Sequence, residues 1–306
     1  MRFSAWPAPA PWKTLLAQWE HVEATGWDGA WIMDHFMPVG SAPDAPVSEA
    51  WTALSALAAR VPRIRIGTMV TGNTYRHPAV LAKMAATVDD ISGGRLVLGI
   101  GAGWQRDEHD AYGIELPSVP ERLRRLEEAA YVIRALFRND RVTFEGLHYR
   151  LTDAVLAPKP VQRLGPPLLI GGGGELVTLR IVASYADEWN MWGLPEHLAA
   201  KIPVLERHCE RQGRDPASIR RTACVQLLVT DGATETERAR DDDRLRRSAQ
   251  PWLIGNVEEL RDVIGRYQEV GVDELIIAAY QAHDYGAITL DSLDRFIEEV
   301  APAFRD

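Results

Sequence analysis

The sequence predicts an α/β fold, a (β/α)8 TIM barrel, in which parallel strands alternate with helices and close on themselves. Short β-rich apolar runs alternate with amphipathic helical segments along all 306 residues, as parallel strands joined by helices do. Eight such runs occur, the number that closes a barrel of this kind. A doubly wound open sheet remains the alternative, because periodicity does not reveal whether a sheet closes.

Each predicted strand is a short run of apolar, β-branched or aromatic residues between helical or turn-forming segments. Runs such as LVLGI (96–100) are apolar almost without interruption, which indicates that helices cover both faces of the sheet. In chain order the strands are RFSAW (2–6), DGAWIMD (28–34), IRIGTMV (64–70), RLVLGIG (95–101), PLLIGG (167–172), DEWNMW (187–192), TACVQLLVT (222–230) and DELIIAAY (273–280).

The clearest helix signal lies between the fourth and fifth strands, over 118–137. Ser118 and Glu121 have the spacing of a capping box, and Pro120 falls in the first turn. Apolar residues then recur at helical spacing up to Phe137. We therefore expect a long amphipathic helix here.

We predict a single domain, 1–306. Two of its segments interrupt the alternation of strands and helices. Residues 139–166 contain a hairpin-like pair around Glu145 and Gly146 and then a proline-rich connector, which indicates an insertion before strand five. Residues 231–251 are highly charged and follow strand seven. Two interpretations fit this composition: a lid over the site, or a solvent-exposed helix.

Composition favours a small-molecule partner in the cytoplasm. The formal net charge of -9 argues against nucleic acid, which selects clustered positive charge. Cys209 and Cys224 are isolated, so they indicate neither a disulfide framework nor a zinc knuckle. We see no signal-peptide apolar region and no run long enough to span a bilayer, and we expect a soluble protein.

The carboxyl ends of barrel strands are where ligand chemistry occurs, and strand two ends in Asp34 and His35. A histidine beside a carboxylate is suited to acid/base work near neutral pH. Neighbours on a strand point to opposite faces, so we expect only one of the two to face the mouth directly. The competing interpretation is structural: His35 hydrogen-bonded in the wall and Asp34 capping a turn.

Glycines mark two further strand ends. After strand four, GIGAGW places Gly101 and Gly103 where a ligand could approach the backbone, but Trp104 breaks the dinucleotide fingerprint GxGxxG. After strand five come Gly171, Gly172, Gly173 and Gly174, followed by a predicted helix. Exposed N–H groups at a helix start favour an anion or cofactor there.

Aromatic residues complete this predicted mouth. Strand six ends in Asn190, Met191 and Trp192, and Trp6 and Trp104 lie at other strand ends, which favours a flat, partly aromatic ligand with these tryptophans against the substrate. None of the four lysines ends a strand, so a Schiff-base aldolase is excluded. There is no HxH or HExxH, hence no metal is expected, and no paired carboxylates suit a glycosidase. An organic cofactor that brings its own chemistry remains.

These motifs resemble the bacterial luciferase-like monooxygenase superfamily, and the DHF form of its strand-two motif resembles the coenzyme F420-dependent branch. The resemblance extends over essentially the whole chain and is most specific from Arg65 to Trp104. The matching segments are MDHF (33–36), GTMVTGNTYRHPAVLAKMAATVDDISGGRLVLGIGAGW (67–104), PKPVQRLGPPLLIGGGG (158–174) and YADEW (185–189).

The resemblance implies a barrel that binds F420, or alternatively FMN, with the ring in its mouth. Asp34 and His35 then lie beside the ring, and His35 serves as acid/base group or stabiliser for hydride transfer at the deazaflavin C5. Met69 and Val70 match a non-prolyl cis peptide behind the ring. The implied cofactor contacts further include Gly101, Ala102, Gly103, Asp107, the glycines from Gly171 onward and, from its strand end, Asn190.

This sequence departs from the family pattern at some positions, and alternative functions remain open. Trp104 stands where sugar-phosphate dehydrogenases of this branch have a catalytic glutamate, and their phosphate-binding lysines have no evident counterparts. Arg76, His77, Arg106 and Arg180 are candidates for the anionic F420 tail, or ordinary surface charges. We expect an F420-dependent oxidoreductase acting on a small, fairly apolar substrate. A reduced-FMN monooxygenase and a non-catalytic cofactor-binding protein are the alternatives, and a homodimer is compatible with each.

Overall fold

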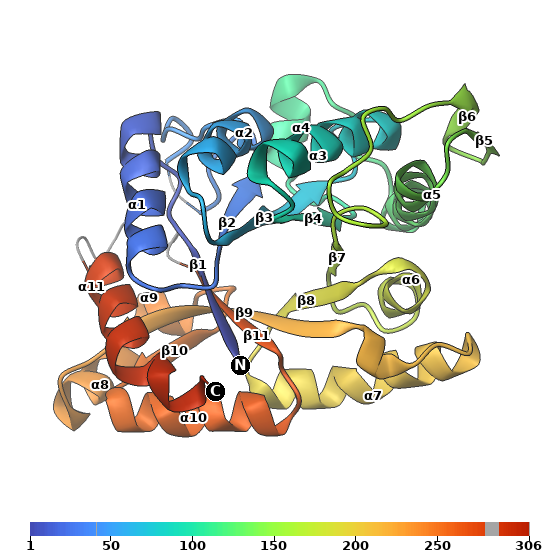
Figure 1. The fold of residues 1–306 in the computed structure, drawn as a ribbon. Coiled ribbons are helices and arrows are strands. Elements are labelled where there is room, and N and C mark those ends of the chain that lie inside the picture. Colours follow the sequence, from blue (N-terminus) through green and yellow to red (C-terminus); the bar gives the residue numbers. More distant parts are fainter. Residues whose placement is uncertain (41, 279–287, 306) are drawn as a thin grey trace.

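A computed structural model describes residues 1–40, 42–278 and 288–305, and its main sheet is a closed parallel barrel (Figure 1). The predicted (β/α)8 fold is confirmed. The last residues of predicted strand eight, 279 and 280, lie outside the described residues. The barrel strands are β1 (Arg2–Trp6), β2 (Gly29–Asp34), β3 (Arg65–Gly72), β4 (Leu96–Gly101), β7 (Leu168–Gly171), β8 (Glu188–Trp192), β9 (Arg220–Val229) and β11 (Glu274–Ala278).

Strand pairing rules out the doubly wound alternative. The order runs β11-β1-β2-β3-β4-β7-β8, and β9 pairs in parallel with both β8 and β11, which closes the ring. In register, Trp6 of β1 lies opposite Ala278 of β11, and Trp192 of β8 lies opposite Cys224 of β9. All strand carboxyl ends therefore lie on one rim.

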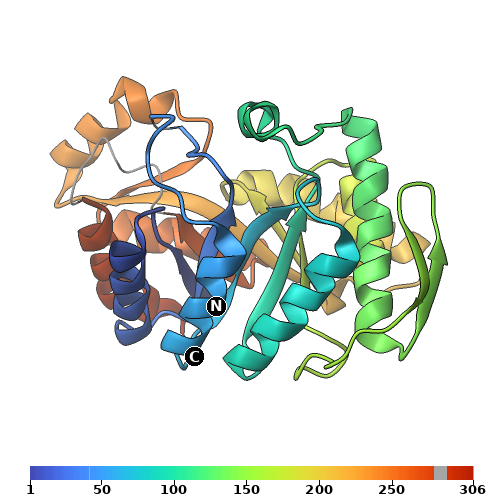
Figure 2. The same cartoon turned by 90° about the horizontal axis from the view of Figure 1, so that it is seen from above.

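Helices surround the barrel, as the turned view shows (Figure 2). Their apolar faces pack on the outer strand faces, where the largest buried side chains include Trp19, Trp27 and Phe296. The helices are α1 (Trp12–Ala24), α2 (Ala50–Arg60), α3 (Pro78–Ser92), α4 (Arg106–Tyr112), α5 (Val119–Arg138), α6 (Thr178–Tyr185), α7 (Pro195–Arg211), η1 (Pro216–Ser218), α10 (Val257–Glu269), α11 (Ile288–Arg295), η3 (Phe296–Val300) and η4 (Ala301–Phe304).

The long helix predicted over 118–137 is α5, but its predicted capping box is wrong. The Ser118 side chain makes no capping hydrogen bond. Glu121 instead accepts from the Arg125 guanidinium, four residues on, at 2.6 Å. An ion pair along the helix surface has replaced the reciprocal cap, a competition that residue spacing alone does not decide.

The two interrupting segments have structure of their own. The insertion forms the antiparallel hairpin β5 (Val142–Glu145) and β6 (Arg150–Ala154). Residues 231–251 contain the short helices α8 (Ala233–Arg240) and α9 (Asp243–Arg246). The sequence analysis missed β10 (Trp252–Gly255), which pairs with β9 on the edge opposite β11, beyond the residues that pair with β8. A four-residue strand after a charged segment carries too short a pattern to predict.

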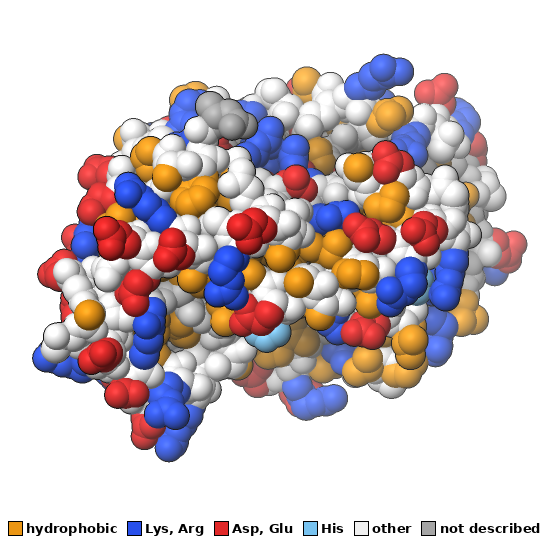
Figure 3. Space-filling model, turned by 90° about the horizontal axis from the view of Figure 1, so that it is seen from below, with side chains coloured by type: hydrophobic (Ala, Val, Ile, Leu, Met, Phe, Trp, Pro, Cys, Tyr) orange, Lys and Arg blue, Asp and Glu red, His pale blue; other side chains and the backbone are white. Residues whose placement is uncertain are grey.

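The surface mixes both signs of charge. On the face seen from below, acidic and basic side chains are interspersed rather than gathered by sign (Figure 3). No helix within the described ranges is long and apolar enough to cross a membrane.

β3 and β4 approach each other unusually closely near the barrel mouth. The Met69–Val70 peptide is cis, as the resemblance implies, and the register of β3 against β4 shifts between Gly67 and Thr71. A Cβ placed on Gly99 would lie 2.0 Å from the carbonyl oxygen of Thr68. Only glycine permits this backbone contact.

Gly99→Ala is therefore expected to lower the free energy of unfolding by more than about 4 kcal/mol, because two barrel strands must separate to admit the methyl group. Urea unfolding measures this loss. Gly232→Ala is the matched control, since a Cβ there meets no atom within 4 Å, and it should change stability by less than about 1 kcal/mol. Similar losses in both variants would contradict the close approach of β3 and β4.

Candidate active site

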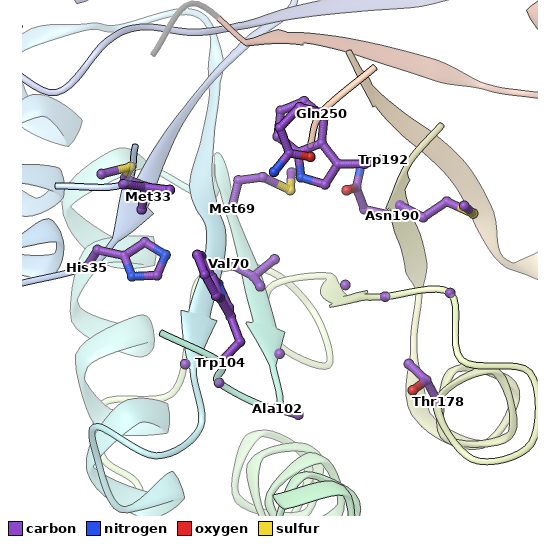
Figure 4. Close-up of a pocket in the computed structure, with 18 of the residues that line it drawn as sticks. Met33, His35, Met69, Val70, Ala102, Trp104, Thr178, Asn190, Trp192 and Gln250 are labelled. Carbon is purple, nitrogen blue, oxygen red and sulfur yellow. The ribbon is translucent and has the colours of Figure 1, made fainter. Parts of the chain in front are cut away.

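One pocket of about 520 Å³ lies at the carboxyl ends of the barrel strands. His35 and Met33 stand on one side of it and Trp192, Gln250 and Asn190 on the other, with Val70 and Trp104 between them (Figure 4). Its volume suits a cofactor with a small substrate. The described lining residues are Trp6, Met33, His35, Val39, Met69, Val70, Gly72, Tyr75, Gly101, Ala102, Gly103, Trp104, Gly171, Gly172, Gly173, Thr178, Asn190, Met191, Trp192 and Gln250.

Asp34 and His35 face different surroundings, as their succession at a strand end predicts. His35 directs its ring into the pocket. Asp34 is completely buried and does not line the pocket. The carboxylate predicted beside the ligand therefore lies behind the wall.

Asp34 is held there by a buried ion pair. The Arg76 guanidinium donates to its two carboxylate oxygens at 2.6 and 3.2 Å and also binds Glu49. Burial raises the pKa of Asp34 above its ordinary value, and the neighbouring Arg76 opposes that rise. This pair joins the end of β2 to the segment after β3 and supports the rim on which His35 stands.

Glu108, which the sequence analysis missed, is the carboxylate that contacts His35. Its Oε1 lies 2.7 Å from His35 Nδ1, and it is completely buried although it belongs to α4. Burial acts to raise the pKa of Glu108, but hydrogen bonds from His35, Tyr75 and Phe36 outweigh it and leave that pKa below its usual value. The only sequence signal was an acidic pair, Asp107 and Glu108, after strand four.

Glycine backbone forms a large part of the wall. Gly101, Gly103 and Gly171 to Gly173 line the pocket, together with Ala102. Gly174 and Asp107 do not: Asp107 is exposed, and its carboxylate accepts from the Glu108 N–H at 3.0 Å. The helix predicted after Gly174 is present as α6, but it begins at Thr178 because residues 175–177 form a turn.

The tryptophans predicted at the mouth all line the pocket. Trp6 and Trp192 have ring centroids 5.7 Å apart, and Trp104, 61% exposed, meets the His35 ring edge-on at 5.6 Å. Asn190 donates to the Thr222 hydroxyl at 2.7 Å. Gln250, from the predicted lid segment, lines the pocket although the sequence analysis did not identify it, as do Met33, Val39, Gly72, Tyr75 and Thr178.

Two of the four cations considered for an anionic tail are already paired. Arg76 binds Asp34, and Arg180 donates to both carboxylate oxygens of Glu127 at 2.5 and 2.8 Å. His77 caps α3 by accepting from Ala79 N–H at 3.2 Å. Arg106 is exposed at the first turn of α4. In the part of the chain that the structure describes, no three His, Cys, Asp or Glu side chains gather as a metal site would require.

The fold and this pocket describe a (β/α)8 barrel with a candidate ligand pocket at its mouth. The profile of the luciferase-like monooxygenase family matches residues 1–249. The F420-dependent glucose-6-phosphate dehydrogenase of Kineococcus radiotolerans is 36% identical, over 92% of this chain and 90% of that protein. The enzyme of the same name from Amycolatopsis mediterranei is 28% identical, over 92% of both chains.

Solved structures share the fold. An F420-dependent secondary alcohol dehydrogenase in complex with an F420-acetone adduct superposes with a TM-score of 0.85 at 24% identity, over 100% of this chain and 99% of that one. The F420-dependent tetrahydromethanopterin reductase of Methanopyrus kandleri gives 0.81 at 19% identity, over 99% of both. The chain belongs to the luciferase-like monooxygenase family, and its resemblance to the F420-dependent branch is confirmed.

Arg76→Met should lower the free energy of unfolding by about 3–5 kcal/mol, because it leaves the buried Asp34 carboxylate without its cation. Urea unfolding measures the effect. Arg60→Met removes an exposed pair with Glu20, at 2.7 Å, and should cost less than about 1 kcal/mol. An equally small loss at Arg76 would show that Asp34 does not depend on it.

Proposed function

We propose that this protein is a coenzyme F420-dependent oxidoreductase that moves a hydride between C5 of the deazaflavin and a small, uncharged, largely apolar organic substrate. The observation that carries the proposal is His35, whose ring faces a pocket walled by glycine backbone and aromatic side chains. The curated relatives, whose names include F420 dependence, support the choice of cofactor.

The pocket fits a flat ring. An added Cβ on Gly101 would lie 2.8 Å from Val70 Cγ2, and one on Gly171 would lie 3.3 Å from the same side chain. Glycines therefore keep the wall of β4 and β7 free of side chains where Val70 projects between them. Val70 and Met69 would support one face of the ring, with Gly101 to Gly103 and Gly171 to Gly173 along its edges.

Bound F420 supplies a carbon, C5, that accepts or gives the hydride. The protein must handle the proton. When an alcohol carbon loses its hydride, its hydroxyl proton passes to His35 Nε2, and reduction of a carbonyl reverses both transfers. Among the described residues Nε2 has no hydrogen-bond partner, while Nδ1 contacts Glu108.

The lining supports an uncharged substrate. No Lys, Arg, Asp or Glu occurs among the described residues that line the pocket. Lys201 binds Glu175 at 2.7 Å, and Lys159 donates to the Leu136 carbonyl at 2.7 Å. A phosphate buried against Trp6, Trp192 and Met33 would lack a compensating cation there, which is strongly unfavourable. We therefore expect a substrate other than the glucose 6-phosphate that appears in the names of the relatives.

Titration with F420 and, separately, with FMN tests the cofactor. We expect submicromolar F420 binding and at least tenfold weaker FMN binding, followed by ligand fluorescence. A reduced-FMN monooxygenase, the alternative on the same fold, requires the reverse order, and tight FMN binding without an F420 response would establish it.

His35→Ala should leave F420 affinity within about threefold while turnover falls by about 10²–10⁴. A non-catalytic binding protein would bind F420 yet turn over neither substrate class.

Glucose 6-phosphate and neutral secondary alcohols distinguish the substrate classes. With F420 supplied, we expect kcat/KM for cyclohexanol to exceed that for glucose 6-phosphate by at least about 10², since burying an unpaired phosphate costs several kcal/mol. Glucose is the matched control for the phosphate alone, and it should be no poorer than glucose 6-phosphate. A clear preference for the phosphorylated sugar would overturn the uncharged-substrate assignment.

A further inference from the structure

The contacts of Glu108 determine which ring nitrogen of His35 carries a proton. Its Oε2 accepts from two backbone N–H groups, those of Phe36 at 2.7 Å and Met37 at 3.1 Å. Its Oε1 receives the Tyr75 hydroxyl and lies 2.7 Å from His35 Nδ1. An ionised carboxylate has acceptors only, so the proton in the contact with His35 belongs to Nδ1.

That assignment leaves Nε2 of neutral His35 as a bare acceptor facing the pocket. The ring cannot easily turn, because Glu108 holds one edge and Trp104 packs against it with an interplanar angle of 76°. The two main-chain donors come from the residues that follow His35 itself. The same carboxylate therefore sets the position of the imidazole and its tautomer.

We propose that Glu108 is the positioning residue of this site: it fixes His35 as the Nδ1–H tautomer, so that Nε2 takes the substrate proton and the carboxylate stabilises the imidazolium that results. This inference rests on the proposed function for its catalytic consequence. Its structural part, the tautomer, stands independently of any cofactor. Carboxylate–imidazole pairs perform the same task in serine hydrolases.

Further contacts agree with this role. Glu108 is completely buried, and the hydrogen bonds made to it hold its pKa below the ordinary value despite the burial. Tyr75 lines the pocket; burial and the nearby Glu108 carboxylate both raise the pKa of its hydroxyl, which remains a donor. The carboxylate thus stays ionised across the neutral range.

Glu108→Gln tests this role because the two ends of the amide group differ: its oxygen accepts hydrogen bonds, whereas its NH₂ donates them. The main-chain N–H groups of Phe36 and Met37 can only donate, so the amide oxygen should face them and the NH₂ should face His35 Nδ1. Nδ1 then becomes the acceptor and the proton moves to Nε2. The hydrogen bonds with the N–H groups of Phe36 and Met37 are kept. His35 Nε2, however, now carries a proton and no longer accepts one from the substrate.

The first measurement is ¹⁵N NMR of the histidine ring nitrogens in the full-length chain without cofactor, with the His35 signals assigned by their loss in His35→Asn. Neutral His35 should be the Nδ1–H tautomer in the unsubstituted protein and the Nε2–H tautomer in Glu108→Gln. An Nε2–H tautomer in the unsubstituted protein overturns the proposal without recourse to any variant.

The second measurement is the pH profile of kcat/KM. Glu108→Gln should lower kcat/KM on the order of 10²–10⁴-fold and change its pH profile, with F420 affinity within about threefold. Asp110→Asn, an exposed carboxylate on the same helix, should leave the tautomer unchanged and kcat/KM within twofold. Unaltered kcat/KM in Glu108→Gln, with its tautomer changed, would refute the catalytic consequence. Failure of F420 to bind would instead refute the proposed function and leave the tautomer result standing.

Discussion

Closure of the parallel sheet is the constraint on which the rest of this protein depends. Because β9 pairs with both β8 and β11, strands far apart in the chain end on one rim. His35 directly after β2, Gly101 from β4 and Trp192 from β8 then line the same pocket. An open sheet would have spread these residues along an edge. Each barrel strand pairs with a neighbour on both sides, so the rim is also a rigid support for the pocket.

Buried carboxylates near this rim have partners. Arg76 compensates Asp34 behind the wall, whereas Glu108 lies 2.7 Å from His35 Nδ1 and accepts from the N–H groups of Phe36 and Met37. At the opposite end of the barrel, Arg65 bridges Glu188 and Glu274 at 2.5 and 2.6 Å. Desolvated ions persist only when partnered. The two carboxylates near the mouth are therefore not interchangeable: Asp34 pairs with Arg76 behind the wall, and Glu108 contacts the imidazole that faces the pocket.

The described residues that line the pocket include no Lys, Arg, Asp or Glu, although the net charge of the chain is -9. Charged side chains form ion pairs on the surface or behind the pocket wall. Aromatic rings, glycine backbone and a few polar groups therefore face the pocket. Such a lining offers shape and aromatic surface rather than charge. Relatives at 28–36% identity are named for a sugar phosphate, whereas no Lys or Arg occurs among the described residues that line this pocket.

Much of the fold was determined by the sequence alone, because strand and helix periods, the glycine run and the placement of His35 at a strand end are local patterns. Tertiary structure decided the rest. Which of two adjacent acids turns inward, Asp107 or Glu108, depends on how α4 packs against a loop 71–73 residues earlier. Likewise the partner of Arg76, the strand β10 and the position of Gln250 depend on neighbours distant in the chain. Local sequence specifies what an element is; only packing specifies which side chains meet.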